Sequence, residues 1–131
     1  MPTKTVILSR VFRTAWFSKA SRKAGISDDH LCVAIAQVMR GQADDLGGGV
    51  FKKRLNDNRH RSIILARGRW YWIYEYLFVK QDRDNIDADE LEAFRALAKN
   101  YAELSEAEVS DLVKQRFFVE ICNGDQAKIQ E

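Results

Sequence analysis

Proline, cysteine and histidine are scarce in this sequence, and it contains no long hydrophobic run. Its 131 residues include one proline, two cysteines and two histidines. No apolar segment reaches the ~20 residues that a membrane-spanning helix needs, and residues 1–13 lack the apolar core of a signal peptide. The only proline is Pro2, so no internal boundary is marked. We therefore expect a soluble, cytoplasmic protein without membrane contact, folded as a single domain over residues 1–131.

The scarcity of metal ligands and of catalytic motifs excludes several classes of enzyme. The two histidines stand far apart, as do the two cysteines, and neither pair has the spacing of a zinc site. The triple glycine at 47–49 lacks the Lys-Ser/Thr of a nucleotide-binding P-loop, and no serine lies in a Gly-x-Ser-x-Gly elbow. We expect neither a metal nor another cofactor. Cys32 falls in the apolar stripe of a predicted helix, so we interpret it as a buried hydrophobic residue and expect no disulfide with Cys122 in a reducing compartment.

Charge is distributed unevenly along the chain, although the net charge is only +2. Residues 1–83 contain 16 Lys/Arg and 7 Asp/Glu, whereas residues 84–131 contain 5 Lys/Arg and 12 Asp/Glu. A basic part joined to an acidic part indicates a surface that binds a polyanion, with acidic helices elsewhere.

Hydrophobic periodicity and capping signals predict an α+β protein. Ser27, Asp87 and Ser105 each precede an apolar helical stripe, as an N-cap does. The segment 63–66 is apolar on both faces, which is typical of a central strand. The expected order is β-α-α-β-β-β-α-α-β, with a mainly antiparallel sheet and a helical hairpin near the N-terminus. Strands are expected at 5–12, 50–55, 61–66, 70–79 and 117–121, and helices at 16–23, 27–41, from 87 and from 105.

The densest functional signal is a run of cations from 52 to 69, which holds seven Lys/Arg and one acid, Asp57. If Phe51 and Leu55 face the core, then Lys52 and Arg54 share the opposite face of their strand. Like charges side by side repel each other. Such clustering is tolerated more easily when the charges bind an anion, so it favours an anion-binding surface. The alternative is a solvated basic surface that only keeps the sheet soluble. The run consists of Lys52, Lys53, Arg54, Arg59, His60, Arg61, Arg67 and Arg69.

Three further features have both a structural and a functional interpretation. His60 is either an exposed turn residue or, with an intrinsic pKa of ~6.5, a proton donor or acceptor beside phosphate. The aromatic run 70–78 has the composition of a base-stacking platform, but the spacing and the neighbouring helical layer favour a core. Lys80, Arg83 and Asn85 follow this run at a strand end, where a rigid support commonly carries functional side chains.

Two segments resemble motifs of a known toxin family. Residues 45–54 read DLGGGVFKKR and are similar to the D-L-G-G-G-(V/L)-x-K-x-R segment of RelE-like toxins. Residues 78–87 read FVKQDRDNID and are similar to the F-x-K-x-x-R-x-N-I segment of the same family. Trp16-Phe17, the strand pair between the motifs and the helix at 89–97 also fit, so the resemblance covers roughly residues 8–121.

This resemblance implies a toxin of the RelE/ParE superfamily from a type II toxin–antitoxin module. The implied fold is a curved, mainly antiparallel sheet packed against an N-terminal helical hairpin, here with additional C-terminal helices. The implied partner is a cognate antitoxin, often with a helix-turn-helix domain, that covers the basic face. The implied activity is metal-independent cleavage of messenger RNA on the ribosome.

The residues present are consistent with that chemistry. In metal-free RNA cleavage the ribose 2′-OH attacks the adjacent phosphate, so the site must accept a proton, stabilise charge and protonate the leaving oxygen. Clustered cations can do much of this, since neighbouring positive charge lowers the pKa of a lysine. The resemblance gives catalytic roles, not divided into acid and base, to Lys52, Arg54, Lys80 and Arg83. The expected RNA-binding residues are Lys53, Arg59, His60, Arg61, Arg67 and Asn85.

One departure from the family leaves the target open. Several ribosome-dependent relatives carry a catalytic tyrosine or histidine near the chain end, whereas residues 116–120 read Arg-Phe-Phe-Val-Glu here. One alternative is therefore a non-enzymatic toxin of the ParE kind, which poisons DNA gyrase through protein contacts. The other is a degenerate nucleic-acid-binding or regulatory relative without toxicity.

Overall fold

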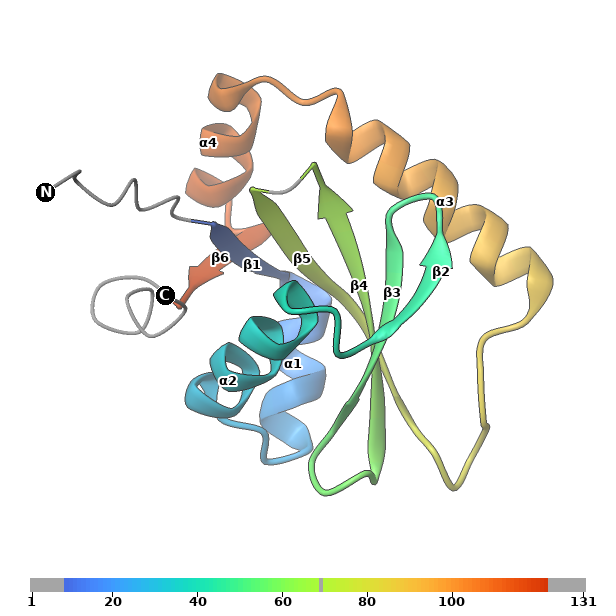
Figure 1. The fold of residues 1–131 in the computed structure, drawn as a ribbon. Coiled ribbons are helices and arrows are strands. Elements are labelled where there is room, and N and C mark those ends of the chain that lie inside the picture. Colours follow the sequence, from blue (N-terminus) through green and yellow to red (C-terminus); the bar gives the residue numbers. More distant parts are fainter. Residues whose placement is uncertain (1–8, 69, 123–131) are drawn as a thin grey trace, which may run out of the picture.

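The described chain forms one mixed sheet with helices on both of its faces (Figure 1). The computed structural model describes residues 9–68 and 70–122. The sheet has the strand order β2-β3-β4-β5-β1-β6. The elements are β1 Arg10–Thr14, α1 Ala15–Lys23, α2 Asp28–Met39, β2 Asp44–Gly47, β3 Val50–Leu55, β4 His60–Arg67, β5 Tyr71–Val79, α3 Ala88–Ala102, α4 Glu106–Lys114 and β6 Phe118–Ile121. The predicted α+β class is confirmed, while residues 5–8 of the first expected strand lie outside the described residues.

Local capping sets where the helices begin. Ser27 caps α2, and its hydroxyl accepts a hydrogen bond from the His30 backbone. Asp87 and Ser105 cap α3 and α4 in complete capping boxes, in which a glutamate three residues on bonds back to the cap. Each box satisfies two backbone donors that the first helical turn leaves open. These three predicted helix starts are confirmed.

The sheet differs from the prediction at one edge, where β2 adds a strand. Its sequence, Asp-Asp-Leu-Gly, has none of the β-branched or aromatic bulk that marks a strand. β2 forms because it pairs antiparallel with β3 across glycines 47–49, all of which have a positive φ. Arg95 of α3 closes over this hairpin by donating to the Leu46 carbonyl, and a Cβ on Gly48 would lie 2.8 Å from the Arg95 side chain.

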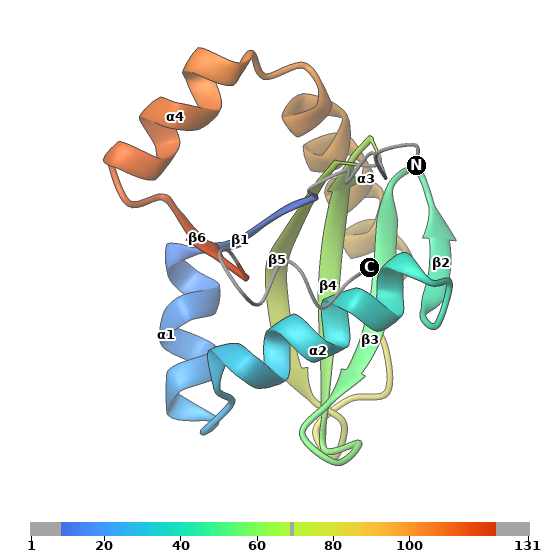
Figure 2. The same ribbon diagram turned by 60° about the vertical axis from the view of Figure 1, so that its left-hand side comes forward.

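The two faces of the sheet carry different helices (Figure 2). Phe17 of α1 and Leu31 of α2 pack with Ile64 and Tyr74 on one face, which we call the α1/α2 face. On the opposite face, the α3/α4 face, α3 packs on Val50, Ile63, Leu65 and Phe78, and α4 packs on Phe12, Ile73 and Phe118. Most of the aromatic run of β5 is therefore core, as predicted, and the hydroxyl of Tyr74 donates to the Leu31 carbonyl at 2.7 Å.

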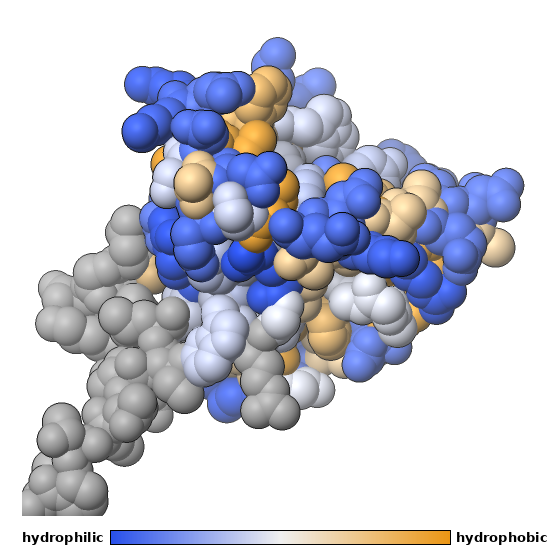
Figure 3. Space-filling model, turned by 90° about the horizontal axis from the view of Figure 1, so that it is seen from above, coloured by the Kyte–Doolittle hydropathy of each residue, from blue (hydrophilic) through white to orange (hydrophobic). Residues whose placement is uncertain are grey.

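The outer surfaces of α3 and α4 are largely hydrophilic when the molecule is seen from above (Figure 3). Most of their acidic side chains, including Glu92, Glu103, Glu108 and Asp111, are exposed. Most of the acidic side chains of α3 and α4 thus point away from the sheet, with the exception of Glu106, which contacts Arg67 and Tyr71. In residues 9–68 and 70–122, no helix has both the length and the apolar character needed to cross a membrane.

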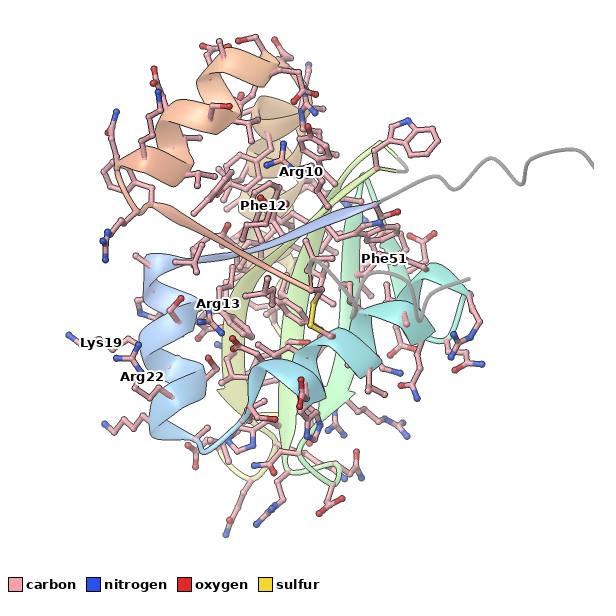
Figure 4. All side chains as sticks on the ribbon, turned by 90° about the vertical axis from the view of Figure 1, so that its left-hand side faces the viewer. Arg10, Phe12, Arg13, Lys19, Arg22 and Phe51 are labelled. Carbon is pink, nitrogen blue, oxygen red and sulfur yellow. A yellow bond between two sulfur atoms is a disulfide. The ribbon has the colours of Figure 1, made fainter. Side chains whose placement is uncertain are left out.

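Cys32 and Cys122 are joined by a disulfide, which contradicts the sequence-based expectation (Figure 4). Cys32 lies in α2 and Cys122 follows β6, at a sequence separation of 90. Spacing along the sequence did not reveal this pairing, because only the return of β6 to β1 brings Cys122 over α2. Both residues are nonetheless buried, so the interpretation of Cys32 as a core residue is confirmed.

Reduction of this disulfide should destabilise the protein. A bond that closes a loop of this length lowers the entropy of the unfolded chain, an effect worth about 4.6 kcal/mol in the loop-entropy model. Urea unfolding with and without dithiothreitol measures the loss. A Cys32→Ala/Cys122→Ala double variant serves as the control, because its unfolding midpoint should not respond to the reductant. An unchanged midpoint of the parent protein, with both thiols shown to be free by titration, would refute a stabilising bond.

Candidate functional site

Three basic residues of β3 and β4, Lys52, Arg54 and Arg61, lie on the α3/α4 face. Arg54 is directly across from Arg61, and Lys52 is directly across from Ile63. Arg61 in turn pairs with Phe78 of β5. Since Ile63 and Phe78 pack beneath α3, the alternation of side chains along a strand places Lys52, Arg54 and Arg61 on that same face.

A β-bulge in β5 directs the end of this strand onto the same face. Ile64 pairs with Tyr74 but Ile63 pairs with Tyr76, so Glu75 is an extra residue without a partner in β4. The insertion reverses the alternation, because Tyr74 packs on the α1/α2 face while Tyr76 and Phe78 pack with α3. The carboxylate of Glu75 accepts a hydrogen bond from a tyrosine of α3, Tyr101, at 2.7 Å, and burial raises the pKa of Glu75. Bulges re-aim side chains in this way and are frequent beside functional sites.

α3 leaves one end of the α3/α4 face uncovered. It crosses the sheet near the β2–β3 hairpin, whereas the ends of β3, β4 and β5 near the turn at 56–59 extend beyond it (Figures 1 and 2). Lys80 follows β5 at this end, and its backbone nitrogen donates to the Arg59 carbonyl at 3.0 Å. The β4–β5 ladder is thus extended by one residue, and alternation places Lys80 on the side of Phe78. We call this end of the sheet the basic face; it consists of Lys52, Arg54, Arg61, Lys80 and Arg83.

Arg61 is a buried cation without an acidic partner among the described residues. Only 6% of its surface is exposed. Its Nη1 donates to the carbonyl oxygens of Asn58 at 3.0 Å and His60 at 3.2 Å. The turn that supplies the Asn58 carbonyl holds residues 56–58 at positive φ, which asparagine and aspartate tolerate better than other side chains. Carbonyl dipoles do not cancel a full charge, so Arg61 keeps an unbalanced positive charge next to Arg54.

Arg83 is fixed by the first turn of α3. Its guanidinium forms a bidentate ion pair with Glu90, donates to the Asn85 carbonyl at 3.0 Å and lies 5.5 Å from the Phe78 ring centre. This ion pair lowers the pKa of Glu90 and raises the pKa of Arg83. Asn85 itself accepts from the Ile86 backbone and has a structural contact there. Arg83 therefore has a defined position, and Glu90 balances its charge.

The lysines of β3 open into a pocket at the edge of the sheet. Lys52 Nζ lies 3.7 Å from Asp44 of β2. Lys53 points to the other face of the sheet, where its Nζ donates to the Gln42 carbonyl at 2.9 Å. Burial, followed by the charges of Arg40 and Arg54, lowers the pKa of Lys53. The pocket measures about 330 Å³ and is lined by Gln42, Ala43, Asp44, Lys52, Lys53 and Arg54.

Arg59 and His60 gather around the turn at 56–59 and not on the basic face. Arg59 donates to the backbone and side-chain oxygens of Asn56. His60 Nδ1 lies 3.2 Å from Asn56 Nδ2, and burial, then the charge of Arg59, lowers the pKa of His60. His30 accepts from the Asn56 backbone at 3.2 Å. Both histidines thus support one turn, and among the described residues neither imidazole ring forms a hydrogen bond with a cation of the basic face.

Arg67 lies at the far end of β4 from the basic face. Six residues separate it from Arg61, which corresponds to about 20 Å along a strand. It donates to the Leu104 carbonyl, lies 3.9 Å from Glu106 and stacks 4.6 Å from the Tyr71 ring centre. Arg67 therefore ties α4 to the sheet and does not share a surface with the other predicted site residues. Arg69 lies outside the described residues.

The electrostatics of the basic face favour phosphate binding. Asp44 balances Lys52 and Glu90 balances Arg83, and sequence reasoning assigned neither acid this role. Within residues 9–68 and 70–122, no acidic side chain forms an ion pair with Arg54, Arg61 or Lys80. Three unbalanced cations remain on a rigid sheet, where they can stabilise negative charge on a phosphate without prior rearrangement.

The fold and the uncovered cations define a small α+β protein with a cationic sheet face. Residues 9–121 match the family model of the RelE toxin of the RelE / RelB toxin–antitoxin system. The chain therefore belongs to the RelE toxin family, whose toxins pair with an antitoxin. No curated protein and no solved structure matches the chain.

Replacing Arg61 should lower the affinity for RNA without lowering the stability of the fold. An Arg61→Met variant removes a buried charge that lacks an acidic partner, and such replacements are often neutral or stabilising. We expect the free energy of unfolding in urea to change by less than about 1 kcal/mol, while affinity for a non-cleavable RNA falls. Arg54→Met is the matched control, because Arg54 is exposed and should affect only RNA affinity. A loss of stability with unchanged RNA affinity in Arg61→Met would assign Arg61 to the fold alone.

Proposed function

We propose that this RelE-family toxin is a metal-independent, ribosome-dependent endoribonuclease that cleaves messenger RNA and inhibits translation in the cytoplasm. Residues 1–131 then form one toxin domain, and a cognate antitoxin with a helix-turn-helix domain covers the basic face. The observation that carries this proposal is the convergence of Lys52, Arg54, Arg61, Lys80 and Arg83 on the uncovered end of the α3/α4 face.

The proposed step needs no group beyond these side chains and the RNA itself. The ribose 2′-oxygen forms a bond to the adjacent phosphorus, and the bond from phosphorus to the 5′-oxygen breaks. The 2′-hydroxyl proton passes to a base on the enzyme, and an acid protonates the leaving 5′-oxygen. Arginine stays protonated in proteins, so within the basic face only Lys52 and Lys80 can exchange a proton. Arg54, Arg61 and Arg83 stabilise the charge that develops on the phosphate oxygens.

One observation favours a second candidate function, that of a non-enzymatic toxin that binds gyrase. β6 and the residues before it carry no tyrosine or histidine, and the exposed side chain of Phe117 stands there instead. A contact surface for a protein target fits this arrangement as well. A regulatory relative without toxicity is the third candidate, because two of the five cations are already balanced by carboxylates.

Loss of either lysine should abolish growth arrest. If Lys52 and Lys80 transfer protons or stabilise the transition state, Lys52→Ala and Lys80→Ala should each lower the cleavage rate on the order of 10²–10⁴-fold. Induced expression, with mapping of messenger RNA ends on ribosomes, measures the effect. Lys19→Ala is the control, because Lys19 is exposed on α1 and projects away from the sheet (Figure 4).

The outcomes separate the three candidates. Full toxicity of both soluble lysine variants would remove the nuclease assignment. Toxicity with intact messenger RNA and induced DNA damage would favour gyrase as the target. A parent protein that does not arrest growth would indicate the regulatory relative.

RNA affinity should fall steeply with salt if the basic face holds phosphates. Each contact with a phosphate of single-stranded RNA releases condensed counterions and adds ~0.7 to the slope of log affinity against log salt concentration. Fluorescence anisotropy with a 2′-O-methyl RNA, which cannot be cleaved, measures this slope. Arg54→Met should lower it by about one contact, and Lys19→Ala should not change it. Affinity that is independent of salt would instead point to a protein target.

A further inference from the structure

An exposed tryptophan adjoins the basic face. Trp16 lies at the start of α1, and 52% of its surface is exposed. Its indole stacks on the Tyr76 ring with 5.2 Å between centroids and 26° between planes. Tyr76 lies 5.9 Å from the Phe78 ring, over which the guanidinium of Arg83 stands. A continuous series of rings therefore leads from solvent to the basic face.

The sheet register places this indole within reach of the same RNA strand. Tyr76, Ile63 and Lys52 form one row across β5, β4 and β3, and Trp16 extends that row beyond Tyr76. Neighbouring strands lie about 4.8 Å apart, so the backbones of Tyr76 and Lys52 are about 10 Å apart. The ring centres of Trp16 and Tyr76 are a further 5.2 Å apart, so a few nucleotides at ~3.4 Å per step of a stacked strand cover the distance from the indole to Lys52.

The backbone on both sides of Trp16 is fixed. The Thr14 hydroxyl caps α1 by accepting from the Phe17 backbone at 3.1 Å, and Ala15 donates to the Phe117 carbonyl at 3.0 Å. Phe17 is fully buried in the core. Trp16 thus presents its indole from a rigid support, and Tyr76 orders one of its sides.

We propose that Trp16 is a stacking platform for one nucleobase of the RNA whose phosphates lie on the basic face. This inference rests on the RNA target proposed above and adds a contact that cations cannot supply. Stacking on an aromatic ring accepts any base and stabilises the complex in addition to the phosphate contacts. The ring also orients the strand whose phosphates lie, a few nucleotides away, on the basic face. The charge of the neighbouring surface favours a polyanion over an apolar protein segment as the occupant.

Binding of two non-cleavable oligomers tests the platform. One is a short 2′-O-methyl RNA, and the other has the same length but lacks every base. Trp16→Leu keeps apolar packing on Tyr76 without an aromatic face, whereas Trp16→Phe keeps a ring. Trp70→Leu is the matched control, because Trp70 is 45% exposed and lies about 20 Å from Tyr76 along β5.

We expect Trp16→Leu to weaken binding of the intact oligomer about 10-fold, in line with the stacking contribution of one base. Trp16→Phe should lose less, and Trp70→Leu should bind as the parent does. The slope against salt concentration should not change in Trp16→Leu, because stacking releases no counterions. On the oligomer without bases, the parent and Trp16→Leu should bind alike.

Four results would overturn the inference. The first is that Trp16→Leu binds the intact oligomer as the parent does. The second is that Trp16→Leu binds both oligomers equally less tightly than the parent. Either result would leave the proposed RNA target in place. Loss of antitoxin or gyrase binding in Trp16→Leu, with RNA binding kept, would show a protein-docking residue. If the parent itself binds neither oligomer, the proposed RNA target and the platform fail together.

Discussion

The β-bulge at Glu75 determines which face of the sheet the side chains at the end of β5 occupy, and so it positions both the core and the basic face. Before the bulge, Tyr74 points to the α1/α2 face, and after it Tyr76 and Phe78 point to the α3/α4 face. A shift of one residue moves every following side chain to the other side of a sheet. Without the extra residue, the end of β5 would place Lys80 away from Lys52, and α3 would lose the Phe78 ring on which it packs. The hydrogen bond from Tyr101 to Glu75 ties α3 to this point.

The register between β3 and β4 also places positively charged side chains next to one another. β3 and β4 place Arg54 and Arg61 opposite each other, where two cations repel. The fold tolerates the repulsion because the turn at 56–59 gives carbonyl oxygens to Arg61 and because Arg54 is open to water. Acids from outside this strand pair balance two other members: Asp44 from β2 balances Lys52, and Glu90 from α3 balances Arg83. The acidic helices thus supply a counter-ion to Arg83 and, through Glu106 of α4, to Arg67, and they direct most of their other charges away from the sheet.

Much of the fold could be predicted from local signals in the sequence. The capping boxes at Asp87 and Ser105 and the apolar strand at 63–66 depend only on neighbouring residues, so the pattern shows them directly. β2 was missed, because an edge strand that exists only through pairing has no pattern of its own. The disulfide and the position of Arg67 were missed for a related reason, since both depend on which distant segments meet.

The sequence predicted which residue types form the candidate site better than it predicted where their side chains lie. Alternation correctly placed Lys52 and Arg54 on one face, because β3 is regular. The continuous aromatic run of β5 hid the bulge, which no periodicity can show when both faces are apolar. Trp16 was part of the resemblance to the toxin family, but nothing in the sequence marked it as exposed, because its exposure depends on the packing of α1 beside β5.

The central claim is that the basic face holds the phosphate at which RNA is cut. Purified toxin, ribosomes carrying a defined message and a chelator provide the most direct measurement, with chemical analysis of the RNA ends. We predict cleavage that leaves a 5′-hydroxyl and a 2′,3′-cyclic phosphate, and an intact message with the Arg54→Met variant. An intact message with the parent protein, or ends that carry a 5′-phosphate, would contradict it.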